Sequence, residues 1–112
     1  MVAIGRSEFM LEVETAFDVP NHTLVVRLAG SADLQSSGTL HAALQAAMAR
    51  SNDLVVDCSK LDFISSMSLS ELISTRLEIR KRSGSFCLVG VSPMIRRLLA
   101  RAKLETLLAV QS

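Results

Sequence analysis

Three short apolar runs, each followed by a helical pattern, constrain the fold of this chain more than any other feature. The runs lie at 23–29, 54–58 and 86–91, and the helices after them are predicted at 35–50, at about 65–82 and from 93 onward. Strands that alternate with helices pair in parallel through right-handed crossovers. The dense apolar character of the runs is typical of strands buried on both faces of a sheet.

Residues 11–17 precede these units and alternate between apolar side chains and polar ones such as Glu12 and Glu14. This alternation predicts a strand with one face in water. A short turn at 19–22 joins it to the next strand, so the two strands form an antiparallel hairpin. The predicted fold is α/β in the order β-β-α-β-α-β-α, with a mixed, mostly parallel sheet and an antiparallel edge strand.

Length and composition predict one domain over residues 1–112, with residues 1–9 as a loose N-terminal extension. The chain has 112 residues, of which 49% are hydrophobic and 21% charged, which is ordinary for a globular domain. Polar residues interrupt the N-terminus early, and no run approaches the length of a membrane span. Cys58 and Cys87 lack metal or CxxC spacing and lie in apolar segments, so buried, reduced thiols and a cytoplasmic location are expected.

Several functional classes are disfavoured by the residues. A net charge of +1 and the absence of Trp and Tyr argue against direct nucleic-acid binding. His22 and His41 are predicted away from the serine-rich segment, so a Ser–His catalytic pair is not expected. There is no phosphate loop, dinucleotide fingerprint or metal spacing. We therefore expect a protein that is not an enzyme, with no catalytic residues, cofactor or metal.

A binding site is expected where the parallel strands end. Sites of open α/β sheets form outside the carboxyl ends of the strands, and here the turns at 30–33, 61–68 and 90–93 follow those ends. The middle turn is rich in serine. Ser68 and Glu71 have the spacing of a capping box, which would leave Ser65 and Ser66 just ahead of the helix.

Two interpretations of these serines stay open. The hydroxyls either cap the helix and satisfy its free amides, or one of them is a phosphorylation site. A phosphate would add about −1.5 to −2 charges, which the helix N-terminus tolerates and a partner packed against it would not.

The chain resembles the STAS domain, the fold of bacterial anti-sigma-factor antagonists, from about residue 11 onward. The matching segments are the strand 54–58 (LVVDC), the turn 63–69 (FISSMSL), the strand end 28–33 (LAGSAD) and the last helix at 91–99 (VSPMIRRLL). In this family a partner serine kinase, which doubles as an anti-sigma factor, is bound by the unphosphorylated antagonist and released by the phosphorylated one. The resemblance therefore implies a partner-switching module that regulates transcription.

By position, the resemblance places the phosphorylated serine at Ser66, with Ser65 as the alternative. Asp33 matches an acidic residue of the family at the same edge of the sheet, and we expect the partner-binding residues there to be Asp33, Ser65, Met67, Ser68 and Ser92. Three residues depart from the family pattern. The family often has Asp at the position of Ser65, a small residue at that of Met67 and Gly at that of Ser68. A glycine there would permit a positive φ.

The departures motivate a second hypothesis, a constitutive, non-catalytic STAS adaptor in a larger assembly such as a signalling scaffold or a lipid-transport complex. Met67 would then be an apolar anchor of the interface. Weak homodimerisation through the edge strand also stays open. The basic residues at 80–82 and 96–103 are interpreted as solvated helix faces, and Asp57 as a structural hydrogen-bond acceptor rather than an acid catalyst.

Overall fold

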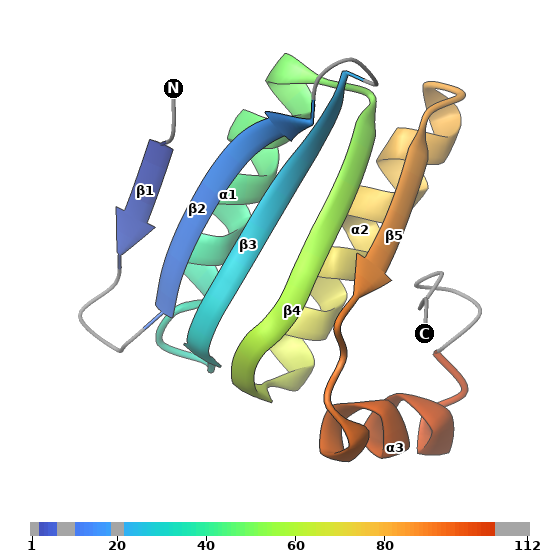
Figure 1. Ribbon diagram of the computed structural model, residues 1–112. Coiled ribbons are helices and arrows are strands. Elements are labelled where there is room, and N and C mark those ends of the chain that lie inside the picture. The colour runs from blue at the N-terminus through green and yellow to red at the C-terminus, as the bar shows by residue number, and fades with distance from the viewer. Residues whose placement is uncertain (1–2, 7–10, 19–21, 105–112) are drawn as a thin grey trace.

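The computed structural model describes residues 3–6, 11–18 and 22–104, which form a mixed five-stranded sheet with three helices (Figure 1). The strands are β1 (Ala3–Arg6), β2 (Leu11–Asp18), β3 (Thr23–Ala32), β4 (Asp53–Ile64) and β5 (Ser85–Val89). The helices are α1 (Ser37–Arg50), α2 (Ser66–Lys81) and α3 (Pro93–Arg101). No helix among the described residues is long and apolar enough to cross a membrane. The sequence also has a short apolar segment at 104–110, of which only Leu104 is among the described residues.

The strands follow one another across the sheet in chain order. β3, β4 and β5 are mutually parallel, and β2 is antiparallel to β3, which confirms the mixed, mostly parallel sheet. β1 is an addition to the predicted order, because residues 1–9 were expected to be a loose extension. Ala3–Arg6 instead pairs antiparallel with β2 and forms the edge. A strand of four residues is too short for a periodicity signal, yet it satisfies backbone groups that β2 would otherwise leave unpaired.

The core lies between the sheet and two helices, α1 and α2, that cover the same face (Figure 1). This placement follows from the topology, because two right-handed crossovers that step in the same direction along a sheet put both helices on one side. Alternate strand residues are therefore buried on that side only. The buried set includes Leu24, Val26 and Leu28 on β3, Leu54, Val56 and Cys58 on β4, and Leu40, Leu44, Leu72 and Ile79 on the helices.

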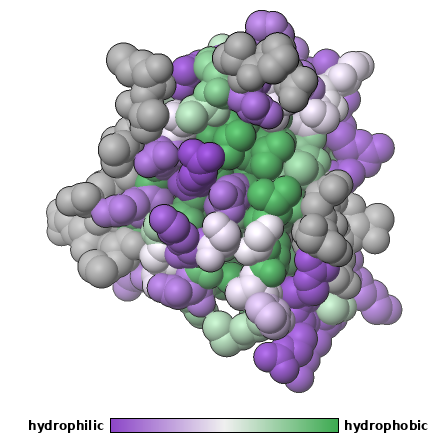
Figure 2. Space-filling view, viewed as in Figure 1, coloured by the Kyte–Doolittle hydropathy of each residue, from purple (hydrophilic) through white to green (hydrophobic). Residues whose placement is uncertain are grey.

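The opposite face of the sheet is open across the described residues, which corrects the expectation of strands buried on both faces. Val25, Val55 and Cys87 point to this side and are only half-buried. Figure 2 views this face and shows hydrophobic residues lying among hydrophilic ones. Cys87 is therefore not the core thiol that its apolar neighbours suggested, whereas Cys58 is buried.

β4 is longer than predicted and ends beside β3. The sequence predicted a strand at 54–58 and a loop after it, but pairing with β3 continues to Ile64. Two register shifts interrupt this pairing, one of them next to Gly30, which has a φ of +95°. Such bulges break the period-two pattern by which a strand is recognised. As a result, Ala32 and Ile64 are register partners at the strand ends.

Candidate functional site

The ends of β3 and β4 are fastened to the start of α2 by one backbone hydrogen bond. The amide of Ser65 donates to the carbonyl of Ala32 over 2.8 Å. Asp33 follows Ala32, and Ser66 follows Ser65, so both residues lie at the carboxyl end of the parallel strands. The structure thus brings Asp33 and Ser66 to one edge of the sheet, as the connectivity predicted.

Ser65, not Ser68, is the N-cap of α2. Its Oγ accepts a hydrogen bond from the amide of Ser68 at 3.1 Å and donates to Ser68 Oγ at 3.2 Å. Ser65 has the extended backbone that an N-cap requires, whereas Ser68 already lies in the first turn and is fully buried. The capping box predicted for Ser68 and Glu71 is therefore wrong, and Glu71 instead bonds to His41 Nδ1 at 2.6 Å.

Ser66 differs from its neighbours because its side chain is exposed and not used by the fold. It is the first residue of α2, and its hydroxyl has no hydrogen bond within the described residues, although its carbonyl accepts one from Ser70 Oγ. The positive end of the helix dipole lies at this point. A negatively charged group on Ser66 would therefore face favourable backbone amides.

Asp33 has a structural partner. Its Oδ1 accepts hydrogen bonds from both the amide and the hydroxyl of Ser36, each at 3.0 Å, and Ser36 Oγ accepts in return from the amide of Asp33 at 2.9 Å. This reciprocal pair holds the turn between β3 and α1, and Ser36 is fully buried. Ser36 was not among the predicted site residues, although an Asp and a Ser three residues apart before a helix are a signal for such a turn.

Ser92 also has a structural role, at the start of α3. Its Oγ accepts a hydrogen bond from the amide of Ile95 at 3.2 Å, and Pro93 is the first helical residue, which confirms the predicted helix start. Ser92 follows β5, so it lies at the same end of the sheet as Ser66 and Asp33. Its side chain is half-buried.

Exposed apolar side chains lie at the same end of the sheet as Ser66. They are Leu34, Phe63, Met67 and Met94, with exposed fractions of 61%, 49%, 48% and 59%. Leu34 follows β3, Phe63 lies near the end of β4, and Met67 and Met94 lie in the first turns of α2 and α3. We call the surface formed by these four residues, Asp33 and Ser66 the carboxyl edge. Exposed apolar groups rimmed by polar ones are typical of protein interaction sites. Of these four residues, only Met67 was among the predicted partner-binding residues.

The histidines do not approach Ser66. His22 immediately precedes β3, at the opposite end of the sheet, with a positive φ of 58°. His41 is held by Glu71 beyond the first turn of α2. Within the described residues no group of three or more His, Cys, Asp or Glu side chains is arranged to hold a metal. Neither histidine is therefore placed to activate the Ser66 hydroxyl.

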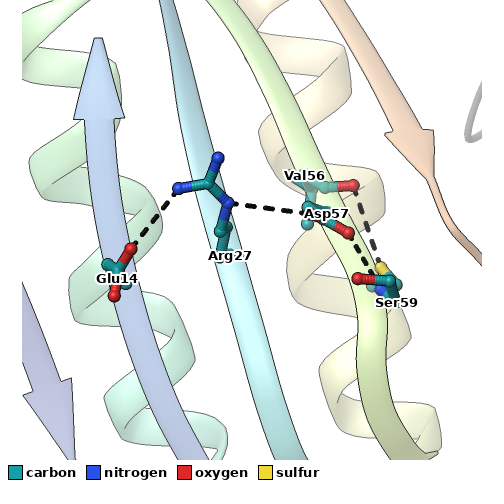
Figure 3. Close-up of polar contacts among 6 residues, drawn as sticks. Glu14, Arg27, Val56, Asp57 and Ser59 are labelled. Carbon is teal, nitrogen blue, oxygen red and sulfur yellow. Dashed lines mark hydrogen bonds and ion pairs between the residues drawn. The ribbon is translucent and has the colours of Figure 1, made fainter.

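A second polar group lies in the middle of the open face (Figure 3). Arg27 bridges Glu14 and Asp57, with nitrogen–oxygen distances of 3.4 and 3.7 Å, and Asp57 Oδ1 accepts from the amide of Ser59 at 2.9 Å. Asp57 is thus a hydrogen-bond acceptor, as predicted. The next residue, Cys58, lies instead on the buried side of β4. Burial, with a smaller contribution from Asp57, raises the pKa of the Cys58 thiol to about 12.

The comparisons with known proteins agree with this architecture. The family model described as "Mlab, STAS domain" matches residues 15–109. None of the curated protein sequences matches the chain.

Solved structures show the same fold at low sequence identity. Unphosphorylated SpoIIAA, an anti-sigma factor antagonist of Bacillus, superposes with a TM-score of 0.73 at 19% identity over 89% of this chain and 88% of its own. An anti-sigma factor antagonist from Mycobacterium paratuberculosis gives a TM-score of 0.71 at 22% identity, over 98% and 83%. A sulfate transporter family protein from Wolinella succinogenes gives 0.69 at 18% identity, over 83% and 79%.

Proposed function

The chain belongs to the STAS-domain family, and from that premise we propose that it is an anti-sigma-factor-antagonist-like binding module switched by phosphorylation of Ser66. Its carboxyl edge binds a protein partner, a serine kinase that doubles as an anti-sigma factor. The unphosphorylated form holds this partner and the phosphorylated form releases it. The protein acts in the cytoplasm as a non-catalytic regulator of transcription.

One observation carries the proposal: Ser66 presents an exposed, unbonded hydroxyl among exposed apolar side chains. A kinase can reach this hydroxyl without unfolding the helix. A phosphate there would meet the favourable end of α2 in the free protein. In a complex the same phosphate would be buried against apolar groups without a cation, which is unfavourable.

The other serines fit this role less well. Ser68 is fully buried, and Ser65 uses its hydroxyl as the N-cap. Phosphorylation of Ser65, the alternative, would act on the cap and so on the helix itself. The solved structures of SpoIIAA include a phosphorylated form as well as an unphosphorylated one, so the fold of that protein accepts the modification.

The test combines mass spectrometry with binding. We expect phosphopeptide analysis of the protein from its native host to locate a phosphate on Ser66 that phosphatase removes. The Ser66→Ala variant should hold the co-purifying partner, and Ser66→Asp should lose it. Ser70→Ala is the matched control, because Ser70 is an exposed serine one turn further along α2. Equal partner binding by Ser66→Asp, Ser66→Ala and wild type would refute the switch.

A constitutive adaptor is the second candidate, and the buried Ser68 favours it. The family pattern usually has glycine here, but this chain places a serine hydroxyl bonded to Ser65. The first turn of α2 is therefore more rigid than one with glycine, which suits a permanent interface anchored by Met67. A stoichiometric partner that stays bound after phosphatase treatment, with Ser66 unmodified under all growth conditions, would favour this function.

A further inference from the structure

α3 has a second face besides the one that packs on the core. Ile95 and Leu99 are buried under the helix, whereas Met94 and Leu98 are exposed by 59% and 42%. Arg97 and Arg101 are also exposed and lie on the same side. Figure 1 shows α3 projecting beyond the end of the sheet. We call Met94, Arg97, Leu98 and Arg101 the α3 stripe; with Ala102 they line a shallow, open hollow.

Within the described residues, no partner compensates the charges of this stripe. Neither Arg97 nor Arg101 has an ion pair or hydrogen bond within the described part of the chain. Residues 79–104 contain no Asp or Glu at all, while cations lie on α3 and in the turn after it. The net charge of +1 therefore conceals a locally positive surface. A ligand that neutralises both guanidinium groups would be attracted over a Debye length, about 8 Å at physiological ionic strength.

We propose that the α3 stripe docks an acidic amphipathic helix of the protein partner. The stripe repeats at positions i, i+3, i+4 and i+7, so one helix with the same spacing can place apolar side chains on Met94 and Leu98. Its carboxylates then face Arg97 and Arg101, where bidentate pairing is available to each guanidinium. This proposal rests on the proposed function, because it identifies the chemistry of the partner.

A protein segment fits this surface better than an anionic membrane does. Two apolar side chains on a helix of nine residues give little area to insert into a lipid interface. Asp33 and Asp62 lie at the same end of the molecule and are at least partly exposed, so a flat anionic surface would be repelled there. A helix that lies along the α3 stripe alone avoids both carboxylates.

The stripe is continuous with the carboxyl edge, since Met94 belongs to both. The partner would therefore contact the edge around Ser66 and place its acidic helix on α3. Because charged rims act mainly on association rate and salt dependence, we expect α3 to accelerate docking. Ser66 then decides whether the docked complex persists.

The test uses a defined probe rather than the unidentified partner. The probe is a fluorescent acidic peptide of about four helical turns, with Leu and Glu at the complementary spacing only in its two middle turns, which match the length of α3. It is titrated with the full chain and followed by anisotropy. Its matched control has Gln in place of every Glu. We expect salt-sensitive binding of the acidic peptide and at least about ten-fold weaker binding of the Gln peptide.

Variants locate the binding on α3. We expect Arg97→Glu/Arg101→Glu to weaken peptide binding at least about ten-fold, and Met94→Ser/Leu98→Ser to weaken it with the charges intact. The control is Arg80→Glu/Lys81→Glu, which makes the same change in charge at the last turn of α2, at the other end of the sheet; it should change binding less than about two-fold.

Three outcomes would overturn the inference: no binding of the acidic peptide, equal loss in the α2 control variant, or tighter binding to phosphatidylglycerol vesicles with the same dependence on Arg97 and Arg101. The last would assign the stripe to a membrane. The Ser66→Asp variant keeps the two proposals apart, because it should bind the peptide like wild type. A failed Ser66 switch with intact peptide binding would then refute only the proposed function.

Discussion

Replacing Ser65 by Ala and, separately, Ser66 by Ala tests whether these adjacent serines have different roles, one in the stability of α2 and the other as a free hydroxyl. Ser65 is the N-cap, and its Oγ makes two hydrogen bonds with Ser68. Ser66 follows it directly and makes none with its side chain in the described residues. The two adjacent serines are therefore expected to respond in opposite ways, with Ser65→Ala lowering the free energy of unfolding and Ser66→Ala leaving it unchanged.

The size of the effect follows from the two bonds. Loss of a serine N-cap costs about 1 kcal/mol. Ser68 is fully buried, and a buried hydroxyl that loses its partner costs about 1 kcal/mol more. We expect Ser65→Ala to be less stable by about 2 kcal/mol, which lowers the Tm by about 8 °C for a domain of this size. Ser66→Ala is exposed and should stay within about 0.5 kcal/mol of wild type.

Urea and thermal unfolding, followed by far-ultraviolet circular dichroism, measure both variants. Ser65→Asp is the rescue control, because Asp is as good an N-cap as Ser and its carboxylate can accept from the amide and the hydroxyl of Ser68. It should recover most of the lost stability. The reasoning is refuted if Ser65→Ala is as stable as wild type, or if Ser66→Ala is destabilised as much as Ser65→Ala.

Two further predictions concern the turn after α2 and the thiols. Ser83 has a φ of 58°, so Ser83→Gly should raise the free energy of unfolding by about 0.5–1 kcal/mol. Gly84→Ala should lower it by more than about 2 kcal/mol, because a Cβ at Gly84 would lie 1.9 Å from the carbonyl oxygen of Asn52. Urea unfolding measures the stability of both variants, and equal stability of the two would contradict these different roles of Ser83 and Gly84. Under native conditions a maleimide should label half-buried Cys87 well before Cys58, as mass spectrometry of peptides can follow; equal labelling rates would contradict the burial of Cys58.

The parallel part of the fold and the position of the site could be predicted because both depend on connectivity. Apolar runs separated by helical patterns admit few topologies, and right-handed crossovers then fix which ends of the strands lie together. Asp33 and Ser66 are far apart in sequence, yet the rule places them at one edge, where the bond between Ser65 and Ala32 joins their segments.

Features that depend on backbone detail could not be predicted. The capping box at Ser68 fits a sequence pattern, but β4 continues to Ile64 through two register shifts, and this extension makes Ser65 the first residue able to cap. Gly84 looks like the glycine that ends a helix, but Ser83 adopts the left-handed conformation and Gly84 is required by the close approach of Asn52. Tertiary contacts decide between neighbouring residues of similar propensity.

The cluster of exposed apolar residues was missed for a different reason. Leu34, Phe63 and Met94 look in sequence like members of the helical or strand patterns beside them. Each lies just past a strand end or in a first helical turn, where the sheet and the helices no longer cover the side chain. Exposure at such positions depends on the ends of several elements at once, so a single periodic pattern does not reveal it.

This arrangement determines what a phosphate on Ser66 would change. In the free protein the phosphate would lie at the N-terminus of α2, where an anion gains about 0.3–1 kcal/mol. In a complex through the carboxyl edge it would be buried beside apolar groups such as Met67, at a cost of several kcal/mol. The two effects have opposite signs, so modification would leave the fold intact while it weakens binding by orders of magnitude. Ser66→Asp should therefore have the Tm of wild type and release the partner, whereas a variant that loses both together would act through unfolding.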